Sequence, residues 1–226
     1  MQGQPGPARP RPRMESLADL IFGLSLSIGS IALIANSPLS SGEINGHILA
    51  FIFTFLILIT FWMIYTTQMS VLPLESRMTT FLNVALLLLV ALVPYLLNSV
   101  ELVNNALSPA QASALRDYSS TLFALDLTGV IAILALFGHV ISMEEKRLVA
   151  PEIAVNFRTG RNMIIIAALL MLVSILPEFW QWTLFGSPLR LYIWYLPLAL
   201  YWVGRAVRPY EAARSTPPTE RANESS

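Results

Sequence analysis

Six apolar segments dominate this chain, and each is close to the roughly 20 residues that an α-helix needs to cross a bilayer. They cover residues 16–35, 47–68, 79–97, 120–143, 163–182 and 189–207. Within hydrocarbon every backbone N–H and C=O must be satisfied inside the spanning structure, which favours helices. We therefore expect an all-α, polytopic membrane protein with six transmembrane helices.

The composition supports a membrane protein and removes several functional classes. Only 12% of the residues are charged and the mean hydropathy is +0.61, whereas a soluble domain carries about 25% charged residues. A net charge of zero gives no basis for binding nucleic acid. The chain has no cysteine, and we find no nucleophile–base pair, metal-ligand spacing or phosphate-binding loop. We expect no cofactor, no metal and no enzymatic activity.

The distribution of lysine and arginine predicts the orientation. Twelve of these residues fall on one side of the expected membrane, and only Arg116 and Arg190 fall on the other. Positive residues concentrate in cytoplasmic segments, so both termini are expected in the cytoplasm. We expect a disordered tail over residues 1–12, a six-helix transmembrane domain over 13–208, and a cytoplasmic C-terminal tail over 209–226.

Polar residues inside the apolar segments share a depth under this topology. Asp19, Trp62, Tyr65 and Asn83 all lie near the cytoplasmic ends of their segments. Hydrogen bonds between transmembrane helices stabilise packing by about 0.6–2 kcal/mol each. We expect one inner polar network, which either locks the helices together or takes a direct part in moving ions or protons.

Asp126 is a separate candidate, because it lies in the outer half of the fourth segment. An ionisable side chain within the membrane costs about 2.5–3.5 kcal/mol even on the lenient insertion scale, so it is a functional candidate by default. The alternative is a carboxylate that is bonded to nearby hydroxyls or faces a wet vestibule.

The first segment carries a periodic aliphatic pattern. Leu24, Ile28 and Ile31 recur at i, i+4 and i+7 and share one helical face, with Ser27 at its edge. Such a face packs toward lipid in one interpretation. In the other, copies of it meet on an axis and form hydrophobic rings that gate by dewetting.

Residues 13–27, 62–65 and 83–95 form three stretches that are similar to motifs of the transmembrane protein 175 family of potassium channels. The first segment resembles the family signature Arg/Lys-x-x-x-Phe-Ser-Asp followed by a Phe-Ala-Ile-type run with a Thr. The second resembles Trp-x-x-His, and the third resembles Asn-x-x-Leu-Leu followed by Pro-Phe. The matching residues here are Arg13, Leu17-Ala18-Asp19, Phe22-Gly23-Leu24, Ser27, Trp62-Met63-Ile64-Tyr65, Asn83-Val84-Ala85-Leu86-Leu87 and Pro94-Tyr95.

The resemblance departs from the family where its motifs are most constant. Leu17-Ala18 replaces Phe-Ser, Tyr65 replaces His, and Ser27 replaces Thr. The last three segments agree with the family only in number and topology. The missing Ser and His belong to the inner hydrogen-bond layer, so we expect a divergent member or a relative with altered packing.

The resemblance implies a homotetramer in a prokaryotic cell membrane that conducts potassium ions passively through a pore lined by the first helix. Leu24, Ile28 and Ile31 match the family's constriction, Ser27 its hydroxyl layer, and Arg13 joins the inner polar network. Two rival interpretations remain. One is a secondary transporter or proton-coupled carrier that uses Asp126, and the other is a membrane protein without transport activity.

Overall fold

The computed structural model describes residues 13–35, 41–72, 77–101, 108–143, 151–185 and 187–215. The chain divides into two compact units, Met1–Ile175 and Leu176–Ser226, each of which is described by itself. The boundary between the units falls inside the domain predicted over residues 13–208. The tail predicted over residues 1–12 lies outside the described residues.

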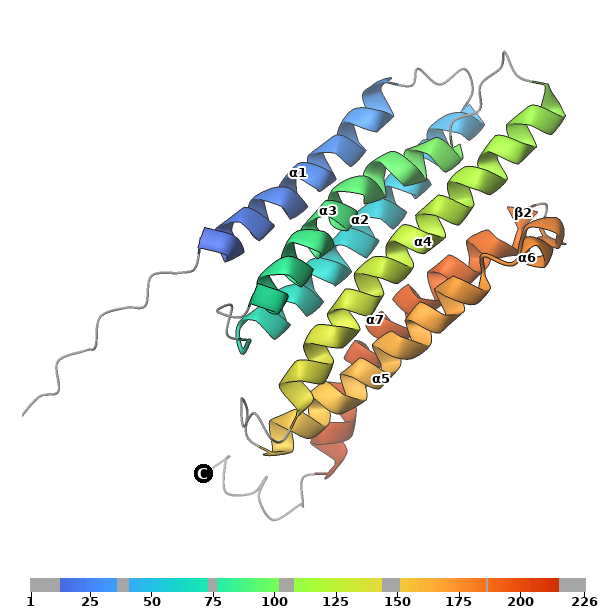
Figure 1. Ribbon diagram of the computed structural model, residues 1–226. Coiled ribbons are helices and arrows are strands. Elements are labelled where there is room, and N and C mark those ends of the chain that lie inside the picture. The colour runs from blue at the N-terminus through green and yellow to red at the C-terminus, as the bar shows by residue number, and fades with distance from the viewer. Residues whose placement is uncertain are drawn as a thin grey trace, which may run out of the picture. The chain divides into compact units, whose positions relative to one another are not determined.

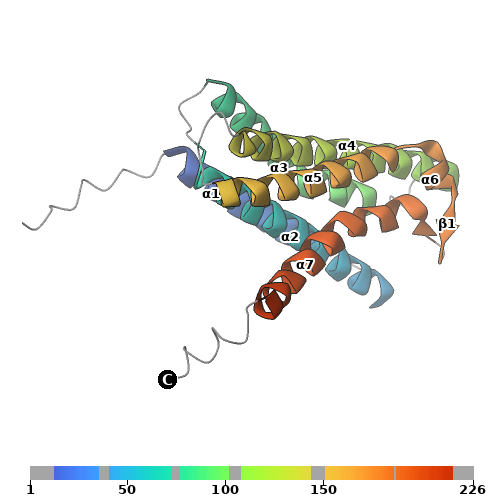
Figure 2. The same cartoon turned by 90° about the horizontal axis from the view of Figure 1, so that it is seen from below.

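The described part of the first unit consists of helices (Figure 1). Helix α1 packs against α2 and α3, and α4 packs against α2, α3 and α5. Figure 2 shows α5 running alongside α4 over much of its length. The helices are α1 (Arg13–Ala35), α2 (Ser41–Met69), α3 (Arg77–Glu101), α4 (Pro109–Ser142) and α5 (Pro151–Val173).

The core of this unit lies mainly between α2, α3 and α4. Its members are large apolar side chains with almost no exposed surface. They include Leu58, Leu86, Val90, Val93, Phe123, Leu134 and Phe137.

The all-α membrane protein predicted from the sequence is confirmed at the level of its helices. Among the described residues, four helical stretches are long and apolar enough to cross a membrane, and α1 contributes a shorter apolar stretch, Ser16–Ile31. The four stretches are Ile44–Met69, Arg77–Val100, Pro109–Ser142 and Ile153–Val173.

The fourth and fifth predicted segments differ most from the helices of the structure. Helix α4 begins at Pro109 rather than at residue 120, because Ser108 and Gln111 form a capping box ahead of the apolar run. The fifth segment was predicted over residues 163–182, but α5 runs over Pro151–Val173. Pro177 has no backbone N–H to continue a helix and instead begins a new one.

The second unit is built around a buried arginine. Arg190 is 1% exposed. Its Nη2 donates a hydrogen bond of 3.3 Å to the carbonyl oxygen of Leu176, and its guanidinium carbon lies 5.5 Å from the ring centre of Trp180. These contacts connect the two helices of the unit. Its elements are α6 (Pro177–Gln181), β1 (Thr183–Leu184), β2 (Ser187–Pro188) and α7 (Leu189–Ser215).

The strands β1 and β2 form a short antiparallel hairpin that the all-α prediction did not contain. Phe185 lies in this turn with φ of 49° and is 91% exposed. A left-handed conformation is unfavourable for an aromatic residue outside a tight turn. Helix α7 continues to Ser215, so part of the predicted 209–226 tail is helical, and residues 216–226 lie outside the described part of the chain.

Candidate functional site

Helix α1 has one face that packs within the unit. Ala18, Phe22 and Ser25 are buried, with exposed fractions of 0%, 3% and 1%. A Cβ atom at Gly29 would lie 3.7 Å from Cγ2 of Thr54, so α1 approaches α2 closely at this point. Small residues spaced by four, here Ser25 and Gly29, permit such close helix–helix contact.

A second face of α1, roughly 120° around the helix from the packed face, carries the aliphatic ladder. Leu24, Ile28 and Ile31 are 57%, 40% and 61% exposed. Ser27 is also exposed, and its hydroxyl donates to the Gly23 carbonyl oxygen at 2.9 Å. That bond holds the Ser27 oxygen against the helix and leaves its lone pairs available to a neighbouring cation. The chain alone therefore presents an apolar stripe with one outward hydroxyl.

A hydrogen bond joins α1 to α2. Trp62 Nε1 donates to Asp19 Oδ1 across a distance of 3.0 Å. On a helical wheel Asp19 lies roughly 120–180° from Leu24, Ile28 and Ile31. Because α2 holds Asp19 on that side, the ladder is turned away from α2. Asp19 is itself exposed, and this hydrogen bond links its carboxylate to α2.

The remaining members of the predicted inner polar network are Tyr65, Asn83 and Arg13, and their surroundings differ from those of Asp19 and Trp62. The ring of Tyr65 is 1% exposed, and its centre lies 5.9 Å from that of Phe22 on α1. Asn83 is fully buried on α3, and neither of its side-chain amide atoms has a hydrogen-bond partner among the described residues. The side chain of Arg13 lies outside the described part of the structure.

Asp126 is buried within the first unit. It is 6% exposed, and neither carboxyl oxygen has a hydrogen-bond partner among the described residues. Three residues further along α4, a Cβ atom at Gly129 would lie 2.9 Å from Cδ1 of Leu89, so α3 and α4 are in close contact here. No described hydroxyl bonds to the carboxyl group, and the wet vestibule that the sequence analysis gave as the other possibility stays a prediction.

Comparison with solved structures gives one clear likeness. The chain aligns with the crystal structure of a lysosomal potassium-selective channel TMEM175 homolog from Chamaesiphon minutus with a TM-score of 0.55. The chain has the fold of this channel. The alignment covers 85% of the chain and 96% of the channel, at 16% sequence identity. No protein-family model matches the sequence, and no curated protein does.

The structural likeness extends beyond the part of the sequence that resembles the family. The sequence motifs end near residue 95, whereas the aligned fold covers most of the chain. It is a likeness to a channel, not to an enzyme. At this level of identity the likeness defines the fold, and the roles of individual residues have to be argued from their geometry.

The sequence interpretation missed the residues that hold α1 in place. Gly23 does not belong to the packed face, because it is exposed and a Cβ atom there would meet nothing within 4 Å. The packed face contains Ser25 and Gly29 instead. Their small-xxx-small spacing was the available signal.

The bond between Asp19 and Trp62 leads to a stability prediction. Trp62→Phe removes the indole donor while keeping an aromatic ring, and we expect it to lower the free energy of unfolding by about 1 kcal/mol. For a domain of this size that corresponds to about 2–4 °C in melting temperature. Thermal unfolding followed by circular dichroism measures the difference.

Asp19→Asn is the matched control for Trp62→Phe, because an asparagine oxygen can still accept the indole N–H. It should lower the melting temperature less than Trp62→Phe does. Equal melting temperatures for Trp62→Phe and the parent chain would mean that this hydrogen bond does not contribute to holding α1.

Proposed function

We propose that this chain is a potassium-permeable cation channel that assembles as a homotetramer around a central pore lined by α1. The observation that carries the proposal is the exposure of Leu24, Ile28 and Ile31 on a face of α1 that is separate from its packed face. The channel fold supports it. A single α1 cannot enclose a pore, so the proposal requires several copies of the chain.

The polar contact between α1 and α2 supports this arrangement, because it does not involve the ladder. Leu24, Ile28 and Ile31 are therefore free to face a pore axis. Asp19 is held by Trp62 on α2, which places its charge away from the proposed conduction path. Conduction then passes rings of aliphatic side chains, with the Ser27 hydroxyls beside them. Such rings offer an ion no replacement for its water shell, and a narrow ring therefore acts as a barrier.

Selectivity in this arrangement comes from the pore radius, retained hydration and the Ser27 hydroxyls. The sequence lacks the Thr-Val-Gly-Tyr-Gly motif whose carbonyl oxygens strip potassium of its hydration shell in other potassium channels. We therefore expect a moderate preference for potassium over sodium.

We further propose six membrane spans, with both termini on the cytoplasmic side of a prokaryotic cell membrane. The twelve-to-two distribution of lysine and arginine supports this orientation. The chain has no native cysteine, so Ser225→Cys provides a single labelling site. An impermeant thiol reagent should label it in opened membranes only, and labelling in intact cells would contradict the orientation.

The function is tested with purified protein in proteoliposomes. Discrete single-channel currents with a reversal potential shifted toward that of potassium are expected, and subunit counting should give four copies. Saturable uptake without discrete currents would contradict the channel, and any other subunit number would contradict the tetramer.

A second candidate function is a carrier centred on Asp126. The observation that favours it is the buried carboxyl group without a hydrogen-bond partner among the described residues. Ionisable residues within a membrane often mark proton or substrate pathways. A carrier should show proton-linked uptake that Asp126→Asn abolishes, whereas the channel should keep its current in that variant.

A further inference from the structure

We propose that the cytoplasmic end of α4 and the first half of α5 form a binding site for the phosphate headgroup of an anionic phospholipid. The cluster consists of His139 and Ser142 on α4 with Arg158, Arg161 and Asn162 on α5. We call it the basic cluster. It lies outside the α1 face, so its occupation is independent of whether α1 lines a pore.

Helix packing places Arg161 at the centre of the basic cluster. Gly138 on α4 lacks a side chain where α5 passes, and a Cβ atom there would lie 3.5 Å from the Cβ of Arg161. The guanidinium group can therefore lie along the last turn of α4. Its Nη1 donates to Nδ1 of His139 at 3.0 Å and to the Ser142 hydroxyl at 3.4 Å.

The charge of Arg161 has no carboxylate partner among the described residues. Its Nε and Nη2 both donate to Oδ1 of Asn162, at 3.2 and 2.9 Å, so its acceptors are an amide, a hydroxyl and an imidazole nitrogen. A guanidinium group has five N–H donors, and these contacts use four. One N–H donor of Arg161 and its net positive charge therefore remain available to bind an anion.

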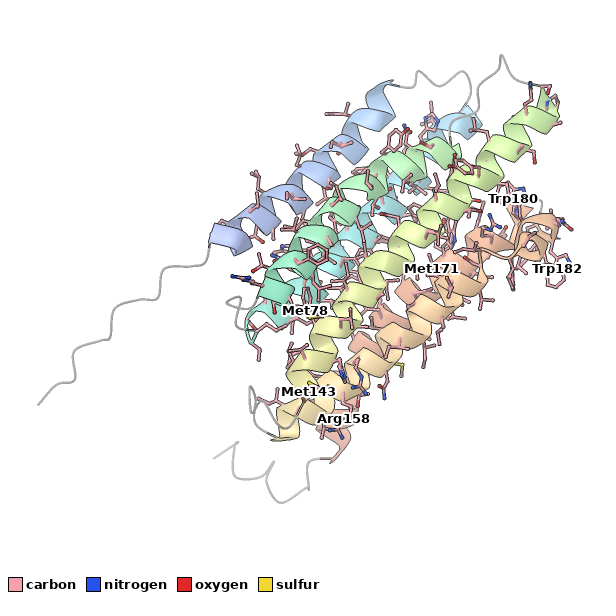
Figure 3. All side chains as sticks on the ribbon, in the orientation of Figure 1. Met78, Met143, Arg158, Met171, Trp180 and Trp182 are labelled. Carbon is pink, nitrogen blue, oxygen red and sulfur yellow. The ribbon has the colours of Figure 1, made fainter. Side chains whose placement is uncertain are left out.

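Arg158 adds a second positive charge on the same face of α5, three residues before Arg161. It is exposed near the start of α5, at the same end of the unit as Met143 at the end of α4 (Figure 3). Planar guanidinium groups bind phosphate through charge-assisted, often bidentate hydrogen bonds. Two of them one helical turn apart suit a phosphodiester headgroup.

Capping of α4 does not account for the basic cluster. A cation near a helix C-terminus often hydrogen-bonds the last carbonyl oxygens. In the described structure the contacts of Arg161 go to side chains, and none goes to an α4 carbonyl oxygen.

The surface next to the arginines favours a lipid over a free phosphate ion. Ile165, Leu169 and Leu172 follow Arg161 at i+4, i+8 and i+11, so they continue the same face of α5 toward the middle of the membrane. They are 41%, 56% and 48% exposed. This face therefore pairs a basic end with an apolar track along which an acyl chain can lie. Basic sites between helices at the cytoplasmic surface are typical of anionic lipid recognition.

The test is a titration of the detergent-solubilised full chain with phosphatidylglycerol or phosphatidylcholine, read by native mass spectrometry. The parent chain should retain phosphatidylglycerol in preference to phosphatidylcholine. Arg161→Gln and Arg158→Gln should each weaken phosphatidylglycerol binding about fivefold. Arg158 is exposed, so its variant is informative even if Arg161→Gln fails to fold.

Arg77→Gln is the matched control, because Arg77 is an exposed arginine at the expected cytoplasmic end of α3, outside the basic cluster. Arg77→Gln should leave phosphatidylglycerol binding unchanged. If it weakened binding as much as Arg158→Gln and Arg161→Gln do, the effect would come from general surface charge, and the proposed site would be overturned. Unchanged binding in Arg158→Gln would also overturn it. If an equal concentration of inorganic phosphate displaced phosphatidylglycerol, the proposal of a lipid ligand would be overturned. The ligand of the basic cluster would then be a free anion.

Discussion

Replacement of Leu24, Ile28 and Ile31 together by serine is expected to raise the unitary potassium current at least about tenfold and to remove most of the preference over sodium. Serine is smaller than either aliphatic residue, so the proposed rings become wider and wetter. A reduction of about 1.4 kcal/mol in the barrier to ion passage is sufficient for a tenfold increase in rate. Single-channel recording under bi-ionic conditions measures both quantities.

Leu88→Ser is the control for the triple variant. Leu88 is 62% exposed on α3, which matches the exposure of the ladder residues but places the change on another helix. Its current and selectivity should equal those of the parent chain. If the triple variant assembles normally and conducts like the parent chain, α1 does not line the conduction path and the proposed pore is wrong.

Replacement of Asp126 by leucine is expected to raise the free energy of unfolding by about 1–3 kcal/mol while the potassium current is retained. The carboxyl group is buried and its oxygens have no hydrogen-bond partner among the described residues, so the folded chain bears the desolvation cost of a polar group. Leucine removes that cost and adds an apolar contact. Chemical or thermal unfolding together with flux measurements tests both parts.

Asp126→Asn separates the two effects at position 126. Asparagine has nearly the same size but remains polar, so it should give little of the stability gained with leucine. A lower stability of Asp126→Leu would mean that the carboxyl group has a stabilising partner in the membrane. Loss of transport in both variants would instead favour the carrier.

The sequence was sufficient to predict the helical membrane class, because a run of about 20 apolar residues in a bilayer can satisfy its backbone only as a helix. It also predicted that Asp19 and Trp62 share a depth, and the structure joins them by a hydrogen bond. It did not predict the limits of α4 and α5, because the capping box at Ser108 and the helix start at Pro177 are short local signals beside long apolar runs. For this reason the predicted start of the fourth segment at residue 120 and the predicted limits of the fifth segment, 163–182, were wrong.

Which face of α1 is packed was decided by the tertiary structure. The sequence offers two faces that contain small residues, and periodicity alone does not rank them. In the structure Ser25 is buried and Gly29 lies close to Thr54 of α2, whereas Leu24 and Ile31 remain exposed. The basic cluster likewise depends on packing. Gly138 and Arg161 are 23 positions apart in the sequence, and only the close approach of α4 and α5 brings the guanidinium group to His139.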